Sequence, residues 1–557
     1  MSALFGMTRG AIRARDRHTV RGAGRLPRVG LSFVLAAILT IAGGDRGTAV
    51  ERTETGEFAV GDMSCAQLLD VALSDTLIRL SEPISAGAFT PPGGSRAFDL
   101  PAFCRVAATT APAVNFEVWL PDDWNGKFQG VGNGGMAGTI SYAAMATGLN
   151  RGYATVSTDT GHEAGDIPFD ASWARGNPQA VEDFGHRALH VATVHGKTLT
   201  DAFYGTPPSY SYYVGCSKGG QQGLMEAQRY PEDYDGLIAG DPANDWTRFY
   251  AGAHLWYSQA LLSNPDSFIP VSKLPLLGTA VNEACDRLDG IEDGILNDPR
   301  QCNFDPAVLT CVTNDDDDSC LTPAQVDAVA AIWSGVQDSD GEVIYPGLVP
   351  GGEASPGGWS RWVLGDERFA SLHWRAGEGF FRHMVFEDLE WDFRTFDFDA
   401  DLDFALAKVG PALDAADPDL RPLRDRGGKL LVYHGWSDPD ISALASIDYY
   451  EDVVTAVADD PNREKALAET REFFRLFLVP GMGHCRGGPG PDQFDALSAL
   501  EAWVERGVAP ERIEASKVDN GEVVMTRPLC PYPEVAQWTG TGSPDDARNF
   551  VCRLDGQ

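Results

Sequence analysis

Ser217, Asp438 and His484 are of the three residue types that together carry out nucleophilic acyl transfer. A serine hydroxyl is a poor nucleophile until an imidazole takes its proton, and a carboxylate fixes the imidazole tautomer and stabilises the imidazolium that forms. The chain order is serine, acid, histidine, which is one of several unrelated orders among serine hydrolases. These residues are therefore the predicted catalytic triad, and the rest of the fold must bring them together.

Ser217 lies at the centre of a G-x-S-x-G sequence, Gly215-Cys216-Ser217-Lys218-Gly219. The aromatic and β-branched run 211–214 before it predicts a buried strand, and residues 220–227 after it predict the start of a helix. Strand, G-x-S-x-G and helix form the nucleophile elbow of α/β-hydrolases, whose sharp turn exposes the serine hydroxyl above the sheet. Glycine-rich turns around a serine also occur as plain loops, but the order of the triad residues favours the elbow.

Asp438 ends the segment 428–438, which begins as an apolar strand, and His484 lies in a glycine-rich loop after another strand. The α/β-hydrolase order places the acid and the base of the triad at these two points of the chain. Asp440 is the alternative acid. His434 is the main alternative base, and we interpret it as structural.

Acyl transfer also needs backbone N–H donors that stabilise the oxyanion. Lys218, the residue after the serine, is predicted to supply one of them. Residues 128–135 indicate a short strand that runs into a glycine-rich loop, and Gly134 or Gly135 is predicted to supply the other. A simple tight turn and a phosphate-binding loop are the alternatives for this loop, although no lysine follows at P-loop spacing.

The elements around these loops predict an α/β fold, an α/β-hydrolase core with a mainly parallel sheet. The run 114–120 alternates as a half-buried strand should, and 153–159 and 236–240 are further predicted strands. Asn177-Pro178 provides an N-cap and an N1 proline for a helix between the strand 153–159 and the elbow strand. A strand–helix–strand unit of this kind indicates a parallel sheet.

A chain of 557 residues is too long for one compact core. The alternation of strands and helices stops from about 246 to 422, where aromatic residues, an acidic run and glycine-proline loops prevail. We predict an inserted lid domain at 244–424, between two parts of the hydrolase core at 50–243 and 425–557. Substrate pockets are lined mainly by apolar and aromatic groups, and the predicted lining residues are Trp374, Phe380, Phe381 and Met384.

The lid also contains a candidate calcium loop, 285–295, with closely spaced acids and glycines that permit sharp turns. Calcium binds about six to eight oxygens, from carboxylates and backbone carbonyls alike. The predicted ligands are the side chains of Asp286, Asp289 and Asp293 and the carbonyl groups of Ile291 and Ile295. The spacing is not that of an EF-hand, and an acidic surface turn is the alternative.

Ten cysteines, an even number with no C-x-x-C pair, favour disulfides over metal thiolates in a secreted chain. Pairing between sequence neighbours predicts Cys65–Cys104, Cys285–Cys302, Cys311–Cys320 and Cys530–Cys552. This leaves Cys216 and Cys485, which stand immediately beside Ser217 and His484. The approach of the serine to the histidine in a triad would bring these two cysteines within disulfide range.

The first 49 residues contain eight of the 44 Lys and Arg residues but only two of the 80 Asp and Glu residues. The apolar run 31–42 follows this basic part, a pattern typical of a secretory signal that is cut between Ala42 and Val50. The mature protein is thus predicted to be secreted or periplasmic, with a retained N-terminal anchor as the alternative. The strongly acidic remainder repels nucleic acid and anionic membranes, so neither is an expected partner.

The chain resembles the tannase/feruloyl esterase family, including its terephthalate monoester hydrolases, in the motifs Gly215-Cys216-Ser217-Lys218-Gly219-Gly220, His434-Gly435-Trp436-Ser437-Asp438 and Gly483-His484-Cys485. The resemblance covers nearly all of the chain after the signal. It implies a serine hydrolase core with a lid, a disulfide between Cys216 and Cys485, and a structural calcium ion at 285–295. Lys218 departs from the family pattern, because many members have threonine at this position.

These observations predict a secreted carboxylic ester hydrolase that acts through an acyl-serine intermediate. The resemblance implies small substrates that are esters of aromatic or phenolic acids, such as feruloyl, galloyl or terephthalate-type esters. One alternative is a lipase or peptidase on the same core. The other is a non-catalytic, calcium-dependent secreted binding protein, which a complete triad in the right order disfavours.

Overall fold

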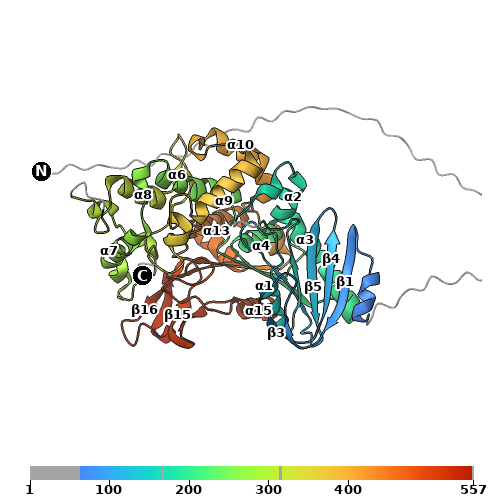
Figure 1. Cartoon of the computed structure of the whole chain (residues 1–557). Helices are drawn as coiled ribbons and strands as arrows, with labels where there is room; N and C mark the ends of the chain where they lie inside the picture. The colour runs from blue at the N-terminus through green and yellow to red at the C-terminus, as the bar shows by residue number, and fades with distance from the viewer. Residues whose placement is uncertain (1–62, 166–168, 313–316, 555–557) are drawn as a thin grey trace, which may run out of the picture. The chain divides into compact units, whose positions relative to one another are not determined.

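The computed structural model describes residues 63–165, 169–312 and 317–554 (Figure 1). The predicted signal at 1–49 lies outside these residues. A nine-stranded sheet with the order β1-β4-β5-β7-β6-β8-β9-β12-β13 forms the centre of the described part of the chain. Neighbouring strands from β7 to β13 pair in parallel, whereas β1, β4, β5 and β7 pair antiparallel. The predicted α/β fold with a mainly parallel sheet is therefore confirmed.

The strands of this sheet are β1 (Thr76–Ile84), β4 (Phe103–Thr110), β5 (Val114–Pro121), β6 (Lys127–Val131), β7 (Ala154–Thr158), β8 (Tyr210–Cys216), β9 (Gly236–Gly240), β12 (Lys429–Gly435) and β13 (Phe474–Val479). Short pairs elsewhere are formed by β2 (Gly87–Phe89) with β3 (Phe98–Leu100), β10 (Val336–Gln337) with β11 (Val343–Tyr345), β14 (Ile513–Asp519) with β15 (Glu522–Leu529), and β16 (Glu534–Trp538) with β17 (Phe550–Leu554).

The α-helices are α1 (Tyr142–Asn150), α2 (Pro178–Glu182), α3 (Ala188–Tyr204), α4 (Lys218–Arg229), α5 (Trp246–Phe249), α6 (Tyr257–Leu262), α7 (Leu274–Cys285), α8 (Pro323–Ser334), α9 (Leu372–Phe380), α10 (Ala400–Lys408), α11 (Gly410–Leu413), α12 (Arg421–Asp425), α13 (Ala443–Val457), α14 (Arg463–Arg471) and α15 (Ala496–Arg506). Two π-helical segments matter for the site, η4 (Tyr250–Trp256) and η10 (Ser360–Leu364).

Helices cover both faces of the parallel strands, which explains why β7 and β9 are buried along their whole length. Successive residues of β8 point to opposite faces of the sheet. Tyr213 packs in the core cluster that contains residues of α3, α4 and α13. Tyr212 packs on the other face, in a cluster with Leu500 and Trp503 of α15.

The segment between β9 and β12 is mainly helical (Figure 1). Its buried aromatic residues belong to a large apolar cluster that also includes residues outside the segment, such as Phe184 and Ile441. Trp246 stacks on Tyr250, which packs against Phe380, and Phe380 contacts Phe381. This segment corresponds to the predicted lid. Its described residues belong to the same compact unit as the rest of residues 59–557, so the boundaries at 244 and 424 stay a prediction.

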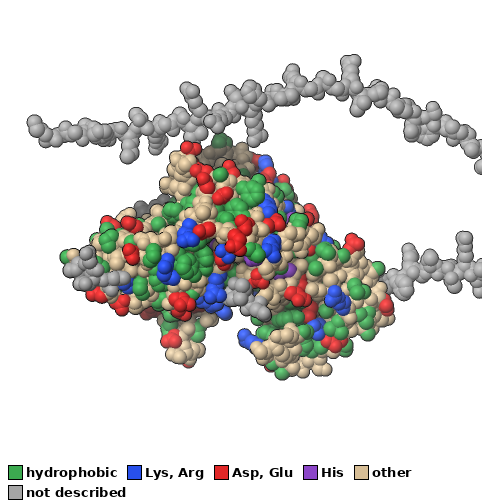
Figure 2. All heavy atoms as spheres, turned by 45° about the horizontal axis from the view of Figure 1, so that its top comes forward, with side chains coloured by type: hydrophobic (Ala, Val, Ile, Leu, Met, Phe, Trp, Pro, Cys, Tyr) green, Lys and Arg blue, Asp and Glu red, His purple; other side chains and the backbone are tan. Residues whose placement is uncertain are grey.

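Five disulfides join the ten cysteines in the pairs expected from the sequence, and one of them connects Cys216 to Cys485. No helix in the described ranges is long and apolar enough to cross a membrane. Acidic and basic side chains lie interspersed on the face of the molecule that Figure 2 shows.

Candidate active site

The turn between β8 and α4 holds Ser217 in a conformation that side chains rarely adopt, with φ 66° and ψ −121°. The two ends of the turn approach so closely that only glycine fits beside it. A Cβ on Gly215 would lie 2.4 Å from the carbonyl oxygen of Gly219. This is the strand–turn–helix geometry of a nucleophile elbow, in which backbone strain places the serine at the edge of the sheet.

Asp438 and His484 lie in the loops that follow the neighbouring parallel strands β12 and β13, and they are in direct contact. Nδ1 of His484 donates a hydrogen bond to Oδ2 of Asp438 at 2.8 Å. The other carboxylate oxygen, Oδ1, accepts hydrogen bonds from the backbone N–H groups of Asp440 and Ile441 at 2.8 and 3.1 Å. The carboxylate is therefore fixed, and it fixes the tautomer in which Nε2 of His484 is free to take a proton.

Ser217 is connected to this pair by a disulfide between neighbouring residues rather than by a hydrogen bond. The Cys216–Cys485 disulfide, with Cα atoms 6.0 Å apart, joins the residue before the serine to the residue after the histidine. Within the described residues the Ser217 hydroxyl makes no hydrogen bond, a looseness that is common in serine hydrolases without substrate. The structure thus places all three predicted triad residues at one edge of the sheet.

The charges around the histidine favour its protonated form. Burial lowers the pKa of the His484 imidazole, but the negative charges of Asp438 and Asp440 outweigh burial and raise it. Burial raises the pKa of the Asp438 carboxyl, but the charge of His484, its hydrogen bond and the approach of His434 Nε2 to Oδ2 at 3.4 Å hold this pKa below its usual range. An imidazolium that forms when the serine loses its proton is therefore stabilised.

The predicted oxyanion donors lie where two elements meet. The N-terminus of α4 packs against the loop after β6 so tightly that a Cβ on Gly219 would lie 3.2 Å from Cα of Gly132. The N–H of Lys218 is in the first turn of α4, where it has no partner within the helix. Gly135 has a positive φ of 55°, and a Cβ on Gly134 would meet no atom within 4 Å, so the loop is open at this point.

The Lys218 side chain, unlike its backbone, is turned into the protein interior. Its Nζ atom donates to Oε1 of Gln221 and lies 4.1 Å from the ring centre of Phe184 and 5.3 Å from that of Trp246. Burial lowers the pKa of this amine well below its usual value. Because the side chain is turned away from the turn, a lysine at this position leaves the backbone N–H of residue 218 in place as the predicted oxyanion donor.

The structure assigns different contacts to the two alternative triad residues. His434 is fully buried, and its nitrogens contact Ser446 Oγ at 2.8 Å and the carbonyl oxygen of Ile441 at 3.0 Å, in keeping with a structural role. Asp440 makes no hydrogen bond to Nδ1 of His484. Its Oδ2 atom lies 3.7 Å from Nε2 of that histidine.

Among the described residues, the aromatic ring in contact with the triad is that of Trp362 of η10, a residue that was not among the predicted ones. Its ring lies edge-on to His484, with ring centres 5.1 Å apart, and it also packs against Phe169. A Cβ on Gly135 would lie 3.3 Å from the Phe169 ring, which places this ring beside the glycine loop. Only the position of an aromatic residue in the fold, and not its type, could have identified Trp362.

The structure gives the four predicted lining residues contacts within the lid, and their role as lining residues stays a prediction. Phe380, Phe381 and Met384 are almost completely buried in the apolar cluster that contains the aromatic residues of the lid. Trp374 packs against Phe369 and Phe393. None of the four has a ring contact or hydrogen bond with a triad residue in the described ranges.

Asp241 is another acidic residue at this end of the strands that was not among the predicted site residues. It follows β9 as Asp438 follows β12, and its Oδ1 accepts a hydrogen bond from the N–H of Gly435 at 2.8 Å.

The chain is similar to known proteins in both sequence and fold. Residues 99–553 match the family of tannase and feruloyl esterase. An uncharacterized esterase of Xanthomonas campestris pv. campestris is 42% identical over 532 residues, which cover 89% of this chain and 92% of that protein. Feruloyl esterase B of Aspergillus niger is 36% identical over 452 residues, which cover 78% of this chain and 83% of that protein.

The crystal structure of feruloyl esterase B from Aspergillus oryzae has the same fold, with a TM-score of 0.79 and 30% identity over 88% of this chain and 99% of that one. The chain belongs to the tannase and feruloyl esterase family. Like the esterases that it matches, this family member is a carboxylic ester hydrolase.

The candidate calcium loop of this esterase lies between α7 and the C-terminal strands. Backbone N–H groups of the loop donate to one oxygen of each predicted carboxylate ligand: Gly294 to Asp286 at 2.9 Å, Ile291 to Asp289 at 2.9 Å and Ile295 to Asp293 at 3.1 Å. Gly290 and Gly294 adopt positive φ values of 88° and 76°, which the sharp turns require.

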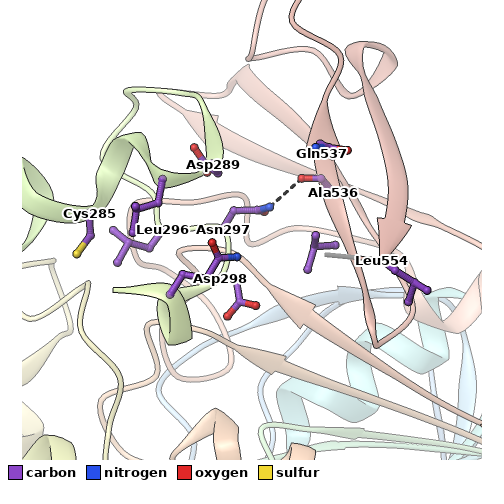
Figure 3. Close-up of a pocket in the computed structure, with 11 residues that line it drawn as sticks. Cys285, Asp289, Leu296, Asn297, Asp298, Ala536, Gln537 and Leu554 are labelled. Atoms are coloured by element: carbon purple, nitrogen blue, oxygen red, sulfur yellow. Dashed lines mark hydrogen bonds between the residues drawn. The ribbon is translucent and has the colours of Figure 1, made fainter. Parts of the chain in front are cut away.

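Part of the donor set in this loop suits a hard cation, although the oxygens of the three carboxylates do not all lie within 4.8 Å of one another in the described ranges. Oδ2 of Asp289 is buried and has no hydrogen-bond partner in the described ranges, and burial raises the pKa of this carboxyl to about 6. Oδ2 of Asp293 accepts from the guanidinium of Arg527 at 2.8 Å, which balances part of the negative charge. A cavity of about 100 Å³ is lined by Asp289, Asn297 and Leu554 (Figure 3), and the side-chain amide of Asn297 donates to the carbonyl oxygen of Ala536 in β16 at 2.8 Å.

Proposed function

We propose that this carboxylic ester hydrolase is a secreted serine esterase that cleaves esters of aromatic or phenolic acids through an acyl-serine intermediate. The observation that carries the proposal is the His484–Asp438 hydrogen bond, formed next to an elbow that presents Ser217 and is tied to His484 by a disulfide. The names of the feruloyl esterase relatives support aromatic acyl groups, and so do Trp362 and Phe169 beside the triad.

In this mechanism Ser217 Oγ attacks the ester carbonyl carbon while Nε2 of His484 takes its proton. The oxyanion accepts hydrogen bonds from the N–H of Lys218 and from that of Gly134 or Gly135. The protonated His484 then gives its proton to the alkoxide that leaves as the alcohol. Water, deprotonated by the same imidazole, attacks the acyl-serine, and the bond between Ser217 Oγ and the acyl carbon breaks as His484 returns the proton to Oγ and the acid is released.

We also propose a structural calcium ion, held by Asp286, Asp289, Asp293 and the carbonyl groups of Ile291 and Ile295. The buried, unpartnered oxygen of Asp289 supports this ion. Calcium would neutralise the loop and supply no chemistry to the reaction. Five disulfides support an oxidising compartment and hence a secreted or periplasmic location.

A substrate panel tests the proposed function. The purified protein and its Ser217→Ala variant are assayed with methyl ferulate, methyl gallate, a terephthalate monoester and a long-chain fatty acyl ester. We expect the highest kcat/KM on one of the aromatic esters, a burst of alcohol release when deacylation is slow, and loss of both in Ser217→Ala. Preference for the long-chain ester would contradict the aromatic specificity, and full activity of Ser217→Ala would contradict the serine mechanism.

A further inference from the structure

Three buried side chains from three different elements meet beside the triad. His254 comes from η4, His373 from α9, and Asp440 from the loop after β12; their exposed fractions are 1%, 0% and 4%. Nε2 of His254 lies 3.0 Å from Oδ1 of Asp440, and Nε2 of His373 lies 3.2 Å from the same oxygen. The ligand-type atoms of all three residues lie within 4.8 Å of one another. The cluster therefore connects the lid to the catalytic core.

Three of the four nitrogens of these two imidazoles lack a hydrogen-bond partner among the described residues. Nε2 of His373 is close to Asp440 but does not have the direction of a hydrogen bond to it. Neither nitrogen of His373, nor Nδ1 of His254, has a hydrogen-bond partner in the part of the chain that the structure describes. Each such buried polar group without a partner destabilises the folded state. His434, equally buried, has partners at both nitrogens. Single unpartnered nitrogens also occur at His162 and His383, but His373 is the one buried histidine in the described ranges with neither nitrogen bonded.

The local backbone is built for the close approach of these two histidines. His254 lies in a π-helical segment, a rare conformation that is frequent at functional sites. Gly377 follows His373 by one helical turn, on the same face of α9. A Cβ on Gly377 would lie 3.1 Å from Cβ of His254, so the absence of a side chain lets α9 and η4 pack together at this point.

We propose that His254, His373 and Asp440 form a binding site for a divalent transition-metal ion of the Zn²⁺ type. Imidazole nitrogens with one carboxylate are ligands that zinc prefers, whereas calcium and magnesium prefer oxygen alone. Tetrahedral zinc, with bonds of about 2.0–2.2 Å, holds its ligand atoms roughly 3.3 Å from one another. The two N–O separations of 3.0 and 3.2 Å need little adjustment to reach this value.

The position of the site predicts its effect on the enzyme. Oδ2 of Asp440 lies 3.7 Å from Nε2 of His484, the atom that receives the serine proton in the proposed function. An ion on Asp440 brings positive charge toward this atom and opposes the formation of an imidazolium. Zinc binding is therefore inhibitory, a consequence that rests on the proposed function, whereas the binding itself does not.

Zinc binding is tested on the full-length protein. The protein is dialysed against 1,10-phenanthroline with CaCl₂ present throughout, then titrated with ZnCl₂ by calorimetry, and its metal content is measured by mass spectrometry. We expect one zinc ion per chain, and an affinity at least about 100-fold lower in His373→Gln, because even loss of an outer contact to a metal ligand costs 10–100-fold. The matched control is His383→Gln, which removes a lid histidine outside the cluster and is expected to bind zinc as the unchanged protein does.

Cobalt provides a second measurement that does not depend on one variant. Co²⁺ in place of zinc is expected to give the visible absorption of a four-coordinate site, and this absorption is expected to be lost in His254→Asn as well as in His373→Gln. Circular dichroism without metal shows which variants are folded. No binding by the unchanged protein, or unaltered binding by folded His373→Gln and His254→Asn, overturns the site.

Inhibition is measured separately, by the hydrolysis of an aryl ester with increasing ZnCl₂. We expect inhibition of the unchanged protein and of His383→Gln at the zinc concentration at which calorimetry shows binding, and no inhibition of His373→Gln in that range. Zinc that binds without changing the rate supports the site and overturns its inhibitory effect. Because calorimetry needs no turnover, a failure of the proposed serine mechanism leaves the binding result intact.

Discussion

Cys216 and Cys485 are joined by a disulfide across 269 residues of sequence, with their Cα atoms 6.0 Å apart. One cysteine precedes the proposed nucleophile Ser217, and the other follows the proposed base His484. The disulfide is therefore the shortest covalent connection between the elbow after β8 and the loop after β13. Its closure restricts how far the serine and the histidine can separate.

Removal of this disulfide is expected to reduce catalysis more than substrate binding. In Cys216→Ala/Cys485→Ala we expect kcat to fall by about 100-fold, because a displacement of about 1 Å at a catalytic group has an effect of this size, with a smaller change in KM. The melting temperature also falls, since so long a loop contributes about 4–5 kcal/mol by chain entropy, less any strain. Steady-state kinetics and calorimetry check both effects.

The matched control is Cys530→Ala/Cys552→Ala. This variant opens the disulfide that joins Cys530, in the segment before β16, to Cys552 in β17. This variant is expected to lose stability but to keep a kcat near that of the unchanged protein. Equal loss of kcat in both double variants would show that general destabilisation, rather than the position of Ser217 relative to His484, explains the effect.

The triad assignment predicts a graded series of variants. Ser217→Ala, His484→Ala and Asp438→Asn are each expected to lower kcat by about 10³-fold or more while circular dichroism stays unchanged. Asp438→Asn replaces the oxygen that accepts from Nδ1 of His484. Asp440→Asn leaves that hydrogen bond intact, and we expect it to retain clearly more activity than Asp438→Asn. The reverse order would make Asp440 the acid of the triad.

The parts of the site that the sequence predicted are those encoded by neighbouring residues. The elbow needs glycine two residues before and two residues after Ser217. A Cβ on Gly215 would indeed lie 2.4 Å from the carbonyl oxygen of Gly219. Asp438 and His484 follow strands whose apolar runs are visible in the sequence, and parallel strands bring the loops at their ends to one edge of the sheet. The fold class and the place of these three residues at one end of the parallel strands could therefore be predicted together.

The parts that were missed depend on packing between distant segments. Trp362 and Phe381 are both aromatic residues of the lid, but one contacts His484 and the other lies in the lid core. Residue type does not separate these environments. The approach of His373 to His254 depends on how α9 crosses η4, and Gly377, the residue that permits it, resembles any other helical glycine in the sequence.

Removal of the proposed calcium ion is expected to destabilise the loop at 285–295 rather than to stop the chemistry directly. Within the described residues Asp286 and Asp289 form no ion pair like that of Asp293 with Arg527. A ligand present at 100 times its Kd stabilises a protein by about 2.7 kcal/mol. We expect EDTA to lower the melting temperature and excess CaCl₂ to restore it. Asp289→Asn is expected to melt at a lower temperature and to respond less to EDTA, and an identical response of both proteins would contradict Asp289 as a ligand.

Glu353 links the stability of the lid to pH. This residue is 1% exposed, and one carboxylate oxygen accepts a hydrogen bond from the N–H of Gly351 at 2.9 Å. Burial raises the pKa of Glu353 to about 7, from 4.5 in the unfolded chain, and the hydrogen bond from Gly351 reduces the shift only in part. The folded state therefore binds the proton more tightly than the unfolded state does.

The sign of the pH effect follows from this difference. The stabilisation by protonated Glu353 is fully present below pH 4.5, is lost as the pH rises toward 7, and is absent above it. The total loss is about 3 kcal/mol, from a shift of roughly 2.5 pH units at 1.36 kcal/mol each.

Glu353→Gln stays neutral, so its free energy of unfolding in urea is expected to exceed that of the unchanged protein by an amount that grows between pH 5 and pH 8. Glu342→Gln, which replaces an exposed glutamate of the same segment, is the control and should follow the unchanged protein at every pH. A parallel course of the Glu353→Gln and unchanged curves would show that Glu353 does not titrate between these values.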